Sequence, residues 1–253
     1  MKAIILAAGY ATRLYPLTEN QPKCLLKVGD KTILDSICEK LNAVPEIDEI
    51  ILVTNAKFFD QLNAWKDHTH SRAKIQVIND GTTSNDTRLG AIGDLGLALK
   101  KAGVTSDFLM MASDNLFEQD LAAFVRFAHS KKNAVSIAVY DIQDPSLAAK
   151  KFGVIEADST GKVTRIEEKP EKPRSSLIGM GVYYFPASSL PLVTEYLSHK
   201  DAQDAPGHYI RWLTNKTEIF SFLFSGLWYD IGDLKALEDA NNLFKKNQSK
   251  RAQ

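Results

Sequence analysis

The sequence predicts an α/β protein with a doubly wound, mostly parallel sheet and an added β-rich lobe. In the first half of the 253-residue chain, short apolar runs alternate with segments whose apolar residues keep helical spacing. That alternation is typical of a parallel sheet with helices on both faces. After about residue 144 the pattern changes to strands that alternate around a polar turn, which indicates antiparallel pairing.

The elements of the first half follow from the spacing of apolar residues. The clearest helix is 33–41, whose apolar residues recur at helical spacing and which Thr32 would cap. We expect the strand 134–140 to complete this doubly wound half. The predicted strands are 2–7, 49–54, 74–78, 107–112 and 134–140, and the predicted helices are 33–41, 58–66, 89–101 and 118–131.

The second half begins with a predicted hairpin around the turn Asp158-Ser159-Thr160-Gly161. No linker separates the halves, so we expect one domain over 1–246, with lobes 1–143 and 144–233 and a closing helix 234–246. The segment 247–253 is polar and predicted to be a frayed tail. The remaining predicted strands are 153–157, 162–168, 178–185 and 218–224, and the remaining helices are 188–197 and 209–213.

Charge and composition favour a small-molecule ligand. Lysine and arginine number 31, and aspartate and glutamate also number 31, so no net field would attract nucleic acid or an anionic membrane. No run approaches the ~18–20 apolar residues that span a bilayer. Cys24 and Cys38 lack metal-type or paired spacing and are predicted to be free thiols. The first apolar run is too short for a signal peptide, and we expect a cytoplasmic protein.

A small-residue turn follows the first predicted strand directly. Gly9 stands in it, and Arg13 and Lys23 follow on the same connecting segment. Small residues let a ligand approach the backbone, and two cations beside exposed N–H groups suit a polyphosphate. An ordinary turn with two solvated basic residues is the alternative. The segment contains no Gly-x-x-x-x-Gly-Lys-Ser/Thr and no Gly-x-Gly-x-x-Gly, which excludes a P-loop or a dinucleotide fingerprint here.

This segment resembles the signature of the sugar-1-phosphate nucleotidyltransferases, with glucose-1-phosphate thymidylyltransferases and uridylyltransferases as the nearest members. The matching residues are Leu-Ala-Ala-Gly-Tyr-Ala-Thr-Arg-Leu-Tyr-Pro-Leu-Thr over 6–18, followed by Pro22-Lys23. The resemblance implies a Rossmann-like sheet with a nucleotide-binding lobe and a sugar-phosphate lobe. It makes Arg13 and Lys23 the catalytic residues. The nucleotide-binding residues that it implies are Leu6, Ala8, Gly9, Tyr10, Ala11 and Thr12.

At Ala11 the sequence departs from the family, which usually has a second glycine there. Alanine keeps the backbone donor but disfavours a positive φ. We therefore expect a loop of different shape around the phosphates.

Two aspartates are the predicted metal ligands. Asp114 follows a buried strand, at the end of a doubly wound sheet where ligands bind. A carboxylate there would repel a triphosphate unless a cation lay between them, and Mg²⁺ takes carboxylate and phosphate oxygens together. Asp230 stands in Trp-Tyr-Asp-Ile-Gly, which resembles the family's second metal-binding motif. Asp233 competes with it, but its place at the start of the last helix favours an N-cap.

The sugar side is implied by two further motifs. Phe152-Gly153-Val154-Ile155 and Glu167-Glu168-Lys169-Pro170 resemble family sequences that line the sugar pocket. In that interpretation the backbone at Gly153 touches the sugar, Glu168 accepts hydrogen bonds from its hydroxyls and Lys169 meets its phosphate. A hairpin with an exposed charged end is the alternative.

The base-reading loop matches the family least. The segment 79–89 is rich in amides, hydroxyls and carboxylates, which could read a base edge, and Asn79 and Asn85 are the candidates. Capping of the next helix explains the same composition equally well. The Gln and Pro of relatives that use dTTP or UTP are missing, so the nucleobase stays open.

The predicted reaction is an Mg²⁺-dependent in-line attack of a sugar 1-phosphate on the α-phosphorus of a nucleoside triphosphate. The expected triphosphate is a pyrimidine one, UTP or dTTP. The phosphate nucleophile is already an anion at neutral pH, since its second pKa is near ~6, so no general base is needed. A cytidylyltransferase acting on phosphocholine or a polyol phosphate, and a non-catalytic nucleotide-sugar-binding domain, are the alternatives. A nicotinamide-dependent oxidoreductase is disfavoured by the missing glycine fingerprint. Family members are often dimers or tetramers, which leaves a homo-oligomer open.

Overall fold

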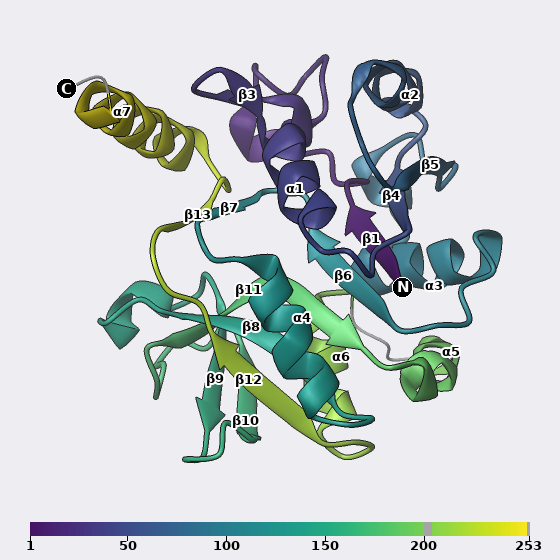
Figure 1. Cartoon of the computed structure of the whole chain (residues 1–253), viewed down its shortest axis with the longest axis vertical. Helices are drawn as coiled ribbons and strands as arrows, with labels where there is room; N and C mark the ends of the chain where they lie inside the picture. Colours follow the sequence, from purple (N-terminus) through teal and green to yellow (C-terminus); the bar gives the residue numbers. More distant parts are fainter. Residues whose placement is uncertain (200–203, 252–253) are drawn as a thin grey trace.

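The computed structural model describes residues 1–199 and 204–251, with side chains up to 243. A nine-stranded mixed sheet forms its centre (Figure 1). The parallel part runs in the order β6-β1-β4-β5, and helices connect its strands. This confirms the predicted doubly wound arrangement. The elements are β1 (Lys2–Leu6), α1 (Ile33–Asn42), β4 (Glu49–Thr54), α2 (Phe59–His68), β5 (Lys74–Asn79), α3 (Ala91–Lys101) and β6 (Phe108–Ala112).

The antiparallel half joins the parallel half through β11 (Leu177–Phe185), which pairs with β6. The predicted place of strand 134–140 is wrong: β8 (Val135–Asp141) pairs with β11 and with β12 (Ile219–Leu223), so it belongs to the second half. Its partners come later in the chain, so local alternation could not reveal them. The predicted hairpin is confirmed as β9 (Gly153–Ala157) and β10 (Val163–Glu168).

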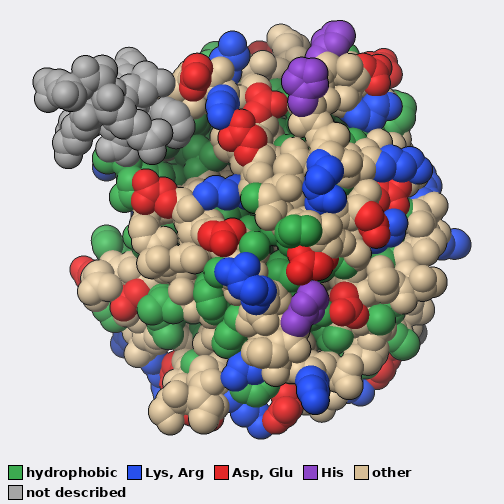
Figure 2. Space-filling model, viewed as in Figure 1, with side chains coloured by type: hydrophobic (Ala, Val, Ile, Leu, Met, Phe, Trp, Pro, Cys, Tyr) green, Lys and Arg blue, Asp and Glu red, His purple; other side chains and the backbone are tan. Residues whose placement is uncertain are grey.

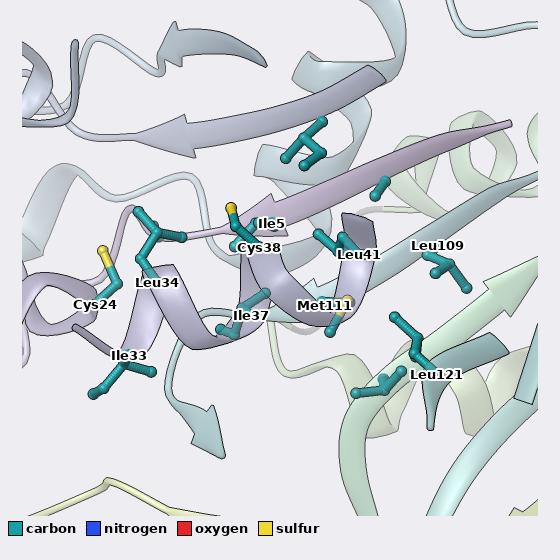
Figure 3. Packing of buried hydrophobic residues seen from close by; sticks show 14 of the residues in the cluster. Ile5, Cys24, Ile33, Leu34, Ile37, Cys38, Leu41, Leu109, Met111 and Leu121 are labelled. Atoms are coloured by element: carbon teal, nitrogen blue, oxygen red, sulfur yellow. The ribbon is translucent and has the colours of Figure 1, made fainter. Parts of the chain in front are cut away.

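Two apolar cores lie on the two faces of the sheet, because successive residues of a strand point to opposite faces. In β1, Ala3 and Ile5 belong to one core and Ile4 to the other. Figure 3 shows α1 packed on the first core, with Ile37 and Leu41 near β1 and β6. Thr32 caps this helix as predicted, its Oγ1 accepting a bond of 3.0 Å from the Asp35 N–H. Both cysteines are buried free thiols, as predicted.

Several helix ends differ from the predicted ones. Helix α4 (Leu121–Ser130) does not begin at residue 118, because Asp120 caps it and residues 115–117 form a strand. Helix α7 (Leu234–Arg251) continues through most of the predicted frayed tail, and residues 252–253 lie outside the described part. The other helices are α5 (Leu190–Ser198) and α6 (Pro206–Leu213), so α6 begins one turn before the predicted start.

Two short ribbons were not predicted. One consists of β2 (Lys27–Val28) and β3 (Lys31–Thr32). The other pairs β7 (Asn115–Phe117) with β13 (Trp228–Asp230), and it lies where the two halves of the molecule meet (Figure 1). Strands of two or three residues are too short to show a periodic pattern.

The face seen in Figure 2 carries acidic and basic side chains interspersed with one another, without a broad area of one sign. Within the described ranges, no helix has both the length and the apolar character needed to cross a bilayer.

Candidate active site

The ribbon of β7 and β13 brings together the two predicted metal ligands. Asp114 directly precedes β7, and Asp230 is the last residue of β13, where it pairs with Asn115. The backbone N–H of Ile231 donates a 2.9 Å bond to the carbonyl oxygen of Asp114. The backbone ladder therefore fixes the two carboxylates next to each other, although they come from opposite halves of the chain.

Asn115 connects this pair to the rest of the site, and sequence analysis missed it. The buried amide accepts a 2.7 Å bond from the indole Nε1 of Trp228 and donates a 2.9 Å bond to Asp114 Oδ1. It thereby orients the Asp114 carboxylate. Its only sequence signal was its place directly after Asp114.

Lys23 is brought to the same point by a short 3₁₀ helix, Lys23–Leu25. Its Nζ lies 2.5 Å from Asp114 Oδ2, and the two side chains are 19% and 22% exposed. Burial, and next the negative charge of Asp114, raise the pKa of Asp230 from 3.8 to about 6, whereas Lys23 and Arg13 act in the opposite direction. Asp114, Lys23 and Arg13 thus all lie within electrostatic reach of Asp230. Arg13 itself is exposed, in the 3₁₀ helix Thr12–Leu14.

The donor set suits a hard divalent cation. Asp114 and Asp230 supply carboxylate oxygens, and Mg²⁺ characteristically takes one or two carboxylates together with phosphate oxygens and waters. Among the described residues, no group of three or more His, Cys, Asp or Glu side chains could enclose a metal ion without substrate. Asp233 acts as the predicted cap instead, its Oδ1 accepting a 2.9 Å bond from the Ala236 N–H.

Two cavities of about 220 and 200 Å³ adjoin at the acidic pair. We call the larger the lobe cavity, because the antiparallel half lines most of it. The smaller is the loop cavity, lined by the turn after β1 and by Lys23. Asp230 lines the lobe cavity. The residues that line both are Ala112, Asp114, Gly181, Tyr183 and Pro206.

Three of the predicted nucleotide-binding residues, Leu6, Gly9 and Ala11, line the loop cavity. Space is open around Gly9, where an added Cβ would meet no atom within 4 Å. The other three residues of this turn, Ala8, Tyr10 and Thr12, do not belong to the described lining of the cavity. The Ala8 carbonyl accepts a 2.9 Å bond from Asn55 Nδ2, the buried Tyr10 hydroxyl lies 3.5 Å from Thr82 Oγ1, and Thr12 is exposed.

Alanine was expected to avoid a positive φ at position 11, and this expectation is wrong. Ala11 adopts φ 46° and ψ 42°, a left-handed conformation that favours glycine. The hydroxyl of Thr18 donates a 2.8 Å bond to the Ala11 carbonyl, and the Leu14 N–H donates to the same oxygen. These bonds hold a conformation that costs an L-residue about 1–2 kcal/mol.

The predicted sugar-side residues Gly153, Glu168 and Lys169 all line the lobe cavity. Glu168 is the last residue of β10 and pairs with Gly153 of β9, so the hairpin register brings them together. Its side chain is only 11% exposed, and its carboxylate lies 3.6 Å from Lys169 Nζ.

Asn79 and Asn85 lie outside the set of described residues that line these two cavities. Asn79 Oδ1 accepts a 2.8 Å bond from the Gly81 N–H, and Asn85 Oδ1 accepts a 3.2 Å bond from Arg88. Both side chains therefore shape their own turns. Their part in base recognition stays a prediction.

Sequence analysis missed a pair of acidic residues, the buried Asp94 and the half-buried Asp80. Asp94 of α3 is 5% exposed and interacts with Asp80. As an ionised carboxylate, Asp94 would leave its Oδ1 without a hydrogen-bond partner. Asp80 in turn accepts bonds of 2.7 and 2.8 Å from the N–H and hydroxyl of Thr82. Burial, and next the charge of Asp80, raise the pKa of Asp94 from 3.8 to about 8. A proton on Asp94 supplies the missing hydrogen bond between the two carboxyl groups.

With this geometry, comparison with known proteins identifies the family. The sequence matches the nucleotidyl transferase family over residues 2–247. This chain belongs to that family.

Relatives resemble the chain over nearly all of its length. It is 29% identical to the bifunctional protein GlmU of Methanocaldococcus jannaschii over 95% of the chain and 53% of that protein. It is 31% identical to mannose-1-phosphate guanylyltransferase 1 of Arabidopsis thaliana over 92% of the chain and 61% of that protein. The chain thus spans little more than half the length of these relatives.

The same fold is present in solved structures. A UDP-glucose pyrophosphorylase complexed with UDP-glucose superimposes with a TM-score of 0.81 at 19% identity, over 97% of this chain and 98% of the other. The predicted α/β architecture is confirmed by this likeness.

Ala11 provides a first test of the loop. We expect Ala11→Gly to change the free energy of unfolding by less than about 0.5 kcal/mol, because relief of strain offsets the added freedom of the unfolded chain. Ala11→Val should lower it by about 1–3 kcal/mol, because a β-branched residue fits the left-handed region poorly. Urea unfolding of the two variants measures this, and equal stability would contradict the strained loop.

Asp94 provides a test by pH. Between about pH 4 and pH 8 the folded chain holds a proton on Asp94 that the unfolded chain has lost, so this group's contribution to stability falls as pH rises. Asp94→Asn keeps the hydrogen bond without titrating. We expect the difference in free energy of unfolding between this variant and the wild type to shift in the variant's favour by on the order of 1–3 kcal/mol from pH 5 to pH 9. Urea unfolding at both pH values measures the gain, and parallel pH profiles would contradict a protonated Asp94.

Proposed function

We propose that this chain joins a sugar 1-phosphate to a nucleoside triphosphate, giving a nucleotide sugar and pyrophosphate. The observation that carries the proposal is the meeting of the two cavities at Asp114. Lys23 lines the loop cavity, Asp230 lines the lobe cavity and Asp114 lines both. Cations and carboxylates thus stand at one junction between two sites, where a reaction between two phosphorylated molecules needs them.

The triphosphate would lie in the loop cavity, where the backbone at Gly9 and Ala11 is accessible. Arg13 would hold the β- and γ-phosphates. Lys23 would leave Asp114 and hold the α-phosphate as its charge develops. Asp114 and Asp230 would hold Mg²⁺, which when bound supplies positive charge against the phosphate oxygens.

The sugar 1-phosphate would lie in the lobe cavity, where Lys169 meets its phosphate and Glu168 accepts hydrogen bonds from its hydroxyls. A phosphate oxygen forms the new bond to the α-phosphorus. The bond from that phosphorus to the bridging oxygen breaks, and pyrophosphate carries away the electron pair. Positioning and electrostatics therefore account for catalysis, and no proton needs to be removed.

The nucleobase is proposed to be a pyrimidine, in UTP or dTTP. The fold shared with a protein that binds UDP-glucose supports this choice. The 31% identity to a guanylyltransferase supports GTP as the competing triphosphate. The test below separates the two, because it compares the rates of pyrophosphate release with GTP, UTP and dTTP.

A phosphocholine substrate is the second candidate, because Phe152, Tyr183 and Trp228 line the lobe cavity. A quaternary amine needs ring faces directed at a common centre. Here Phe152 packs against Trp228 edge to face at 5.5 Å, and Tyr140 packs on Trp228 at 5.4 Å. These rings therefore pack against one another and do not face a common centre, which favours a sugar phosphate over phosphocholine.

The test is pyrophosphate release from each of ATP, CTP, GTP, UTP and dTTP with sugar 1-phosphates, polyol phosphates and phosphocholine, with and without Mg²⁺. We expect release with a sugar 1-phosphate in Mg²⁺, fastest with UTP or dTTP. Asp230→Asn serves as the inactive control. If the rate is fastest with CTP and phosphocholine, the second substrate is phosphocholine and not a sugar 1-phosphate. If no pair of substrates releases pyrophosphate, a binding domain without catalysis is favoured.

Arg13→Ala should lower kcat about 10²- to 10³-fold, because the guanidinium would stabilise charge on the leaving pyrophosphate. The side chain is exposed, so the melting temperature should stay within about 1 °C of the wild type. Arg126→Ala, which removes an exposed arginine on α4, is the matched control. Steady-state kinetics decide the matter: an unchanged kcat would remove Arg13 from the catalytic residues.

A further inference from the structure

The carboxylate of Glu168 occupies a space that two glycines leave open. Gly153 pairs with it across the hairpin of β9 and β10, and Gly207 lies in the first turn of α6. All three residues line the lobe cavity. A Cβ on Gly153 would lie 3.1 Å from Glu168 Oε2.

The contact at Gly207 is much closer. A Cβ there would lie 1.9 Å from Glu168 Oε2 and 2.9 Å from its Cδ, so an alanine and the present carboxylate position exclude each other. Gly207 lies within a helix, where alanine is favoured over glycine by about 1 kcal/mol. The backbone therefore does not require glycine at this position, whereas the Glu168 carboxylate does.

We propose that Gly207 is a positioning residue for the second substrate: the missing side chain lets the Glu168 carboxylate lie against α6 and face the lobe cavity. This inference rests on the proposed function. It adds to that function a residue that acts only through Glu168 and that no motif in the sequence indicated. Pro206, the preceding residue, lines both cavities, so the same turn of α6 forms part of each wall.

The substitution Gly207→Ala is a sharp probe, because the atoms that it meets are the far end of a flexible side chain. The helix keeps its backbone and the carboxylate must move. We expect the KM for glucose 1-phosphate, or for whichever sugar 1-phosphate the wild type uses fastest, to rise about 10- to 100-fold. That is the usual loss for a hydrogen bond to a charged group. The KM for the triphosphate should change less than about twofold, and the melting temperature should not fall.

The matched control is Gly96→Ala. Gly96 is also a helical glycine, in α3, and its Cβ would also meet the end of a flexible side chain, 2.5 Å from Leu197 Cδ1. It belongs to neither set of described cavity-lining residues, so both KM values should stay at wild-type levels.

A double-mutant cycle tests whether Gly207 acts through Glu168. In a Glu168→Ala background there is no carboxylate to displace, so adding Gly207→Ala should change the KM for the sugar phosphate less than about twofold. A full additional effect in that background, or a wild-type KM for Gly207→Ala alone, would overturn the role of Gly207 while the transfer activity of the wild type stands. If the wild type transfers to no sugar 1-phosphate, the proposed function fails and this role fails with it.

Discussion

The site depends on the ladder between β7 and β13. These three-residue strands place Asp230 opposite Asn115 and join Ile231 to Asp114 by a backbone hydrogen bond. Burial of Asp230 and, next, the negative charge of Asp114 raise the pKa of Asp230, so holding the two carboxyl groups close together is unfavourable. The backbone pairing of the ladder, together with the bond from Trp228 to Asn115, holds the two residues adjacent. It therefore places Asp114 and Asp230 at the junction of the two cavities.

The sequence predicted the main strands of the parallel half, because β1, β4 and β6 are mostly buried on both faces and read as nearly continuous apolar runs. The family signature also predicted that Lys23, Asp114 and Asp230 would meet, and they do. Glu168 and Gly153 were predicted to share a site, and the hairpin register brings them together. Each of these features is recorded in a local pattern or in a motif of several residues.

What the sequence could not predict depends on contacts that only the folded chain makes. The strand β8 takes its place from β11 and β12, both of which come later. Ala11 is held in a left-handed conformation by Thr18, a tertiary constraint that overrides its intrinsic preference. The pKa of Asp94 is raised because folding buries its carboxyl group and, next, brings Asp80 beside it. In each case the local sequence does not show which neighbour determines the strand pairing, the backbone conformation or the protonation.

The two cavities share part of their wall, so their shapes cannot change independently. Tyr183, Gly181 and Pro206 border both, so a substitution that reshapes one pocket alters the surface of the other. Under the proposed function, a change of preference for one substrate would then alter the binding of the other. Directed evolution toward a new substrate should accordingly begin from libraries that vary these shared positions together and score both substrates in every round.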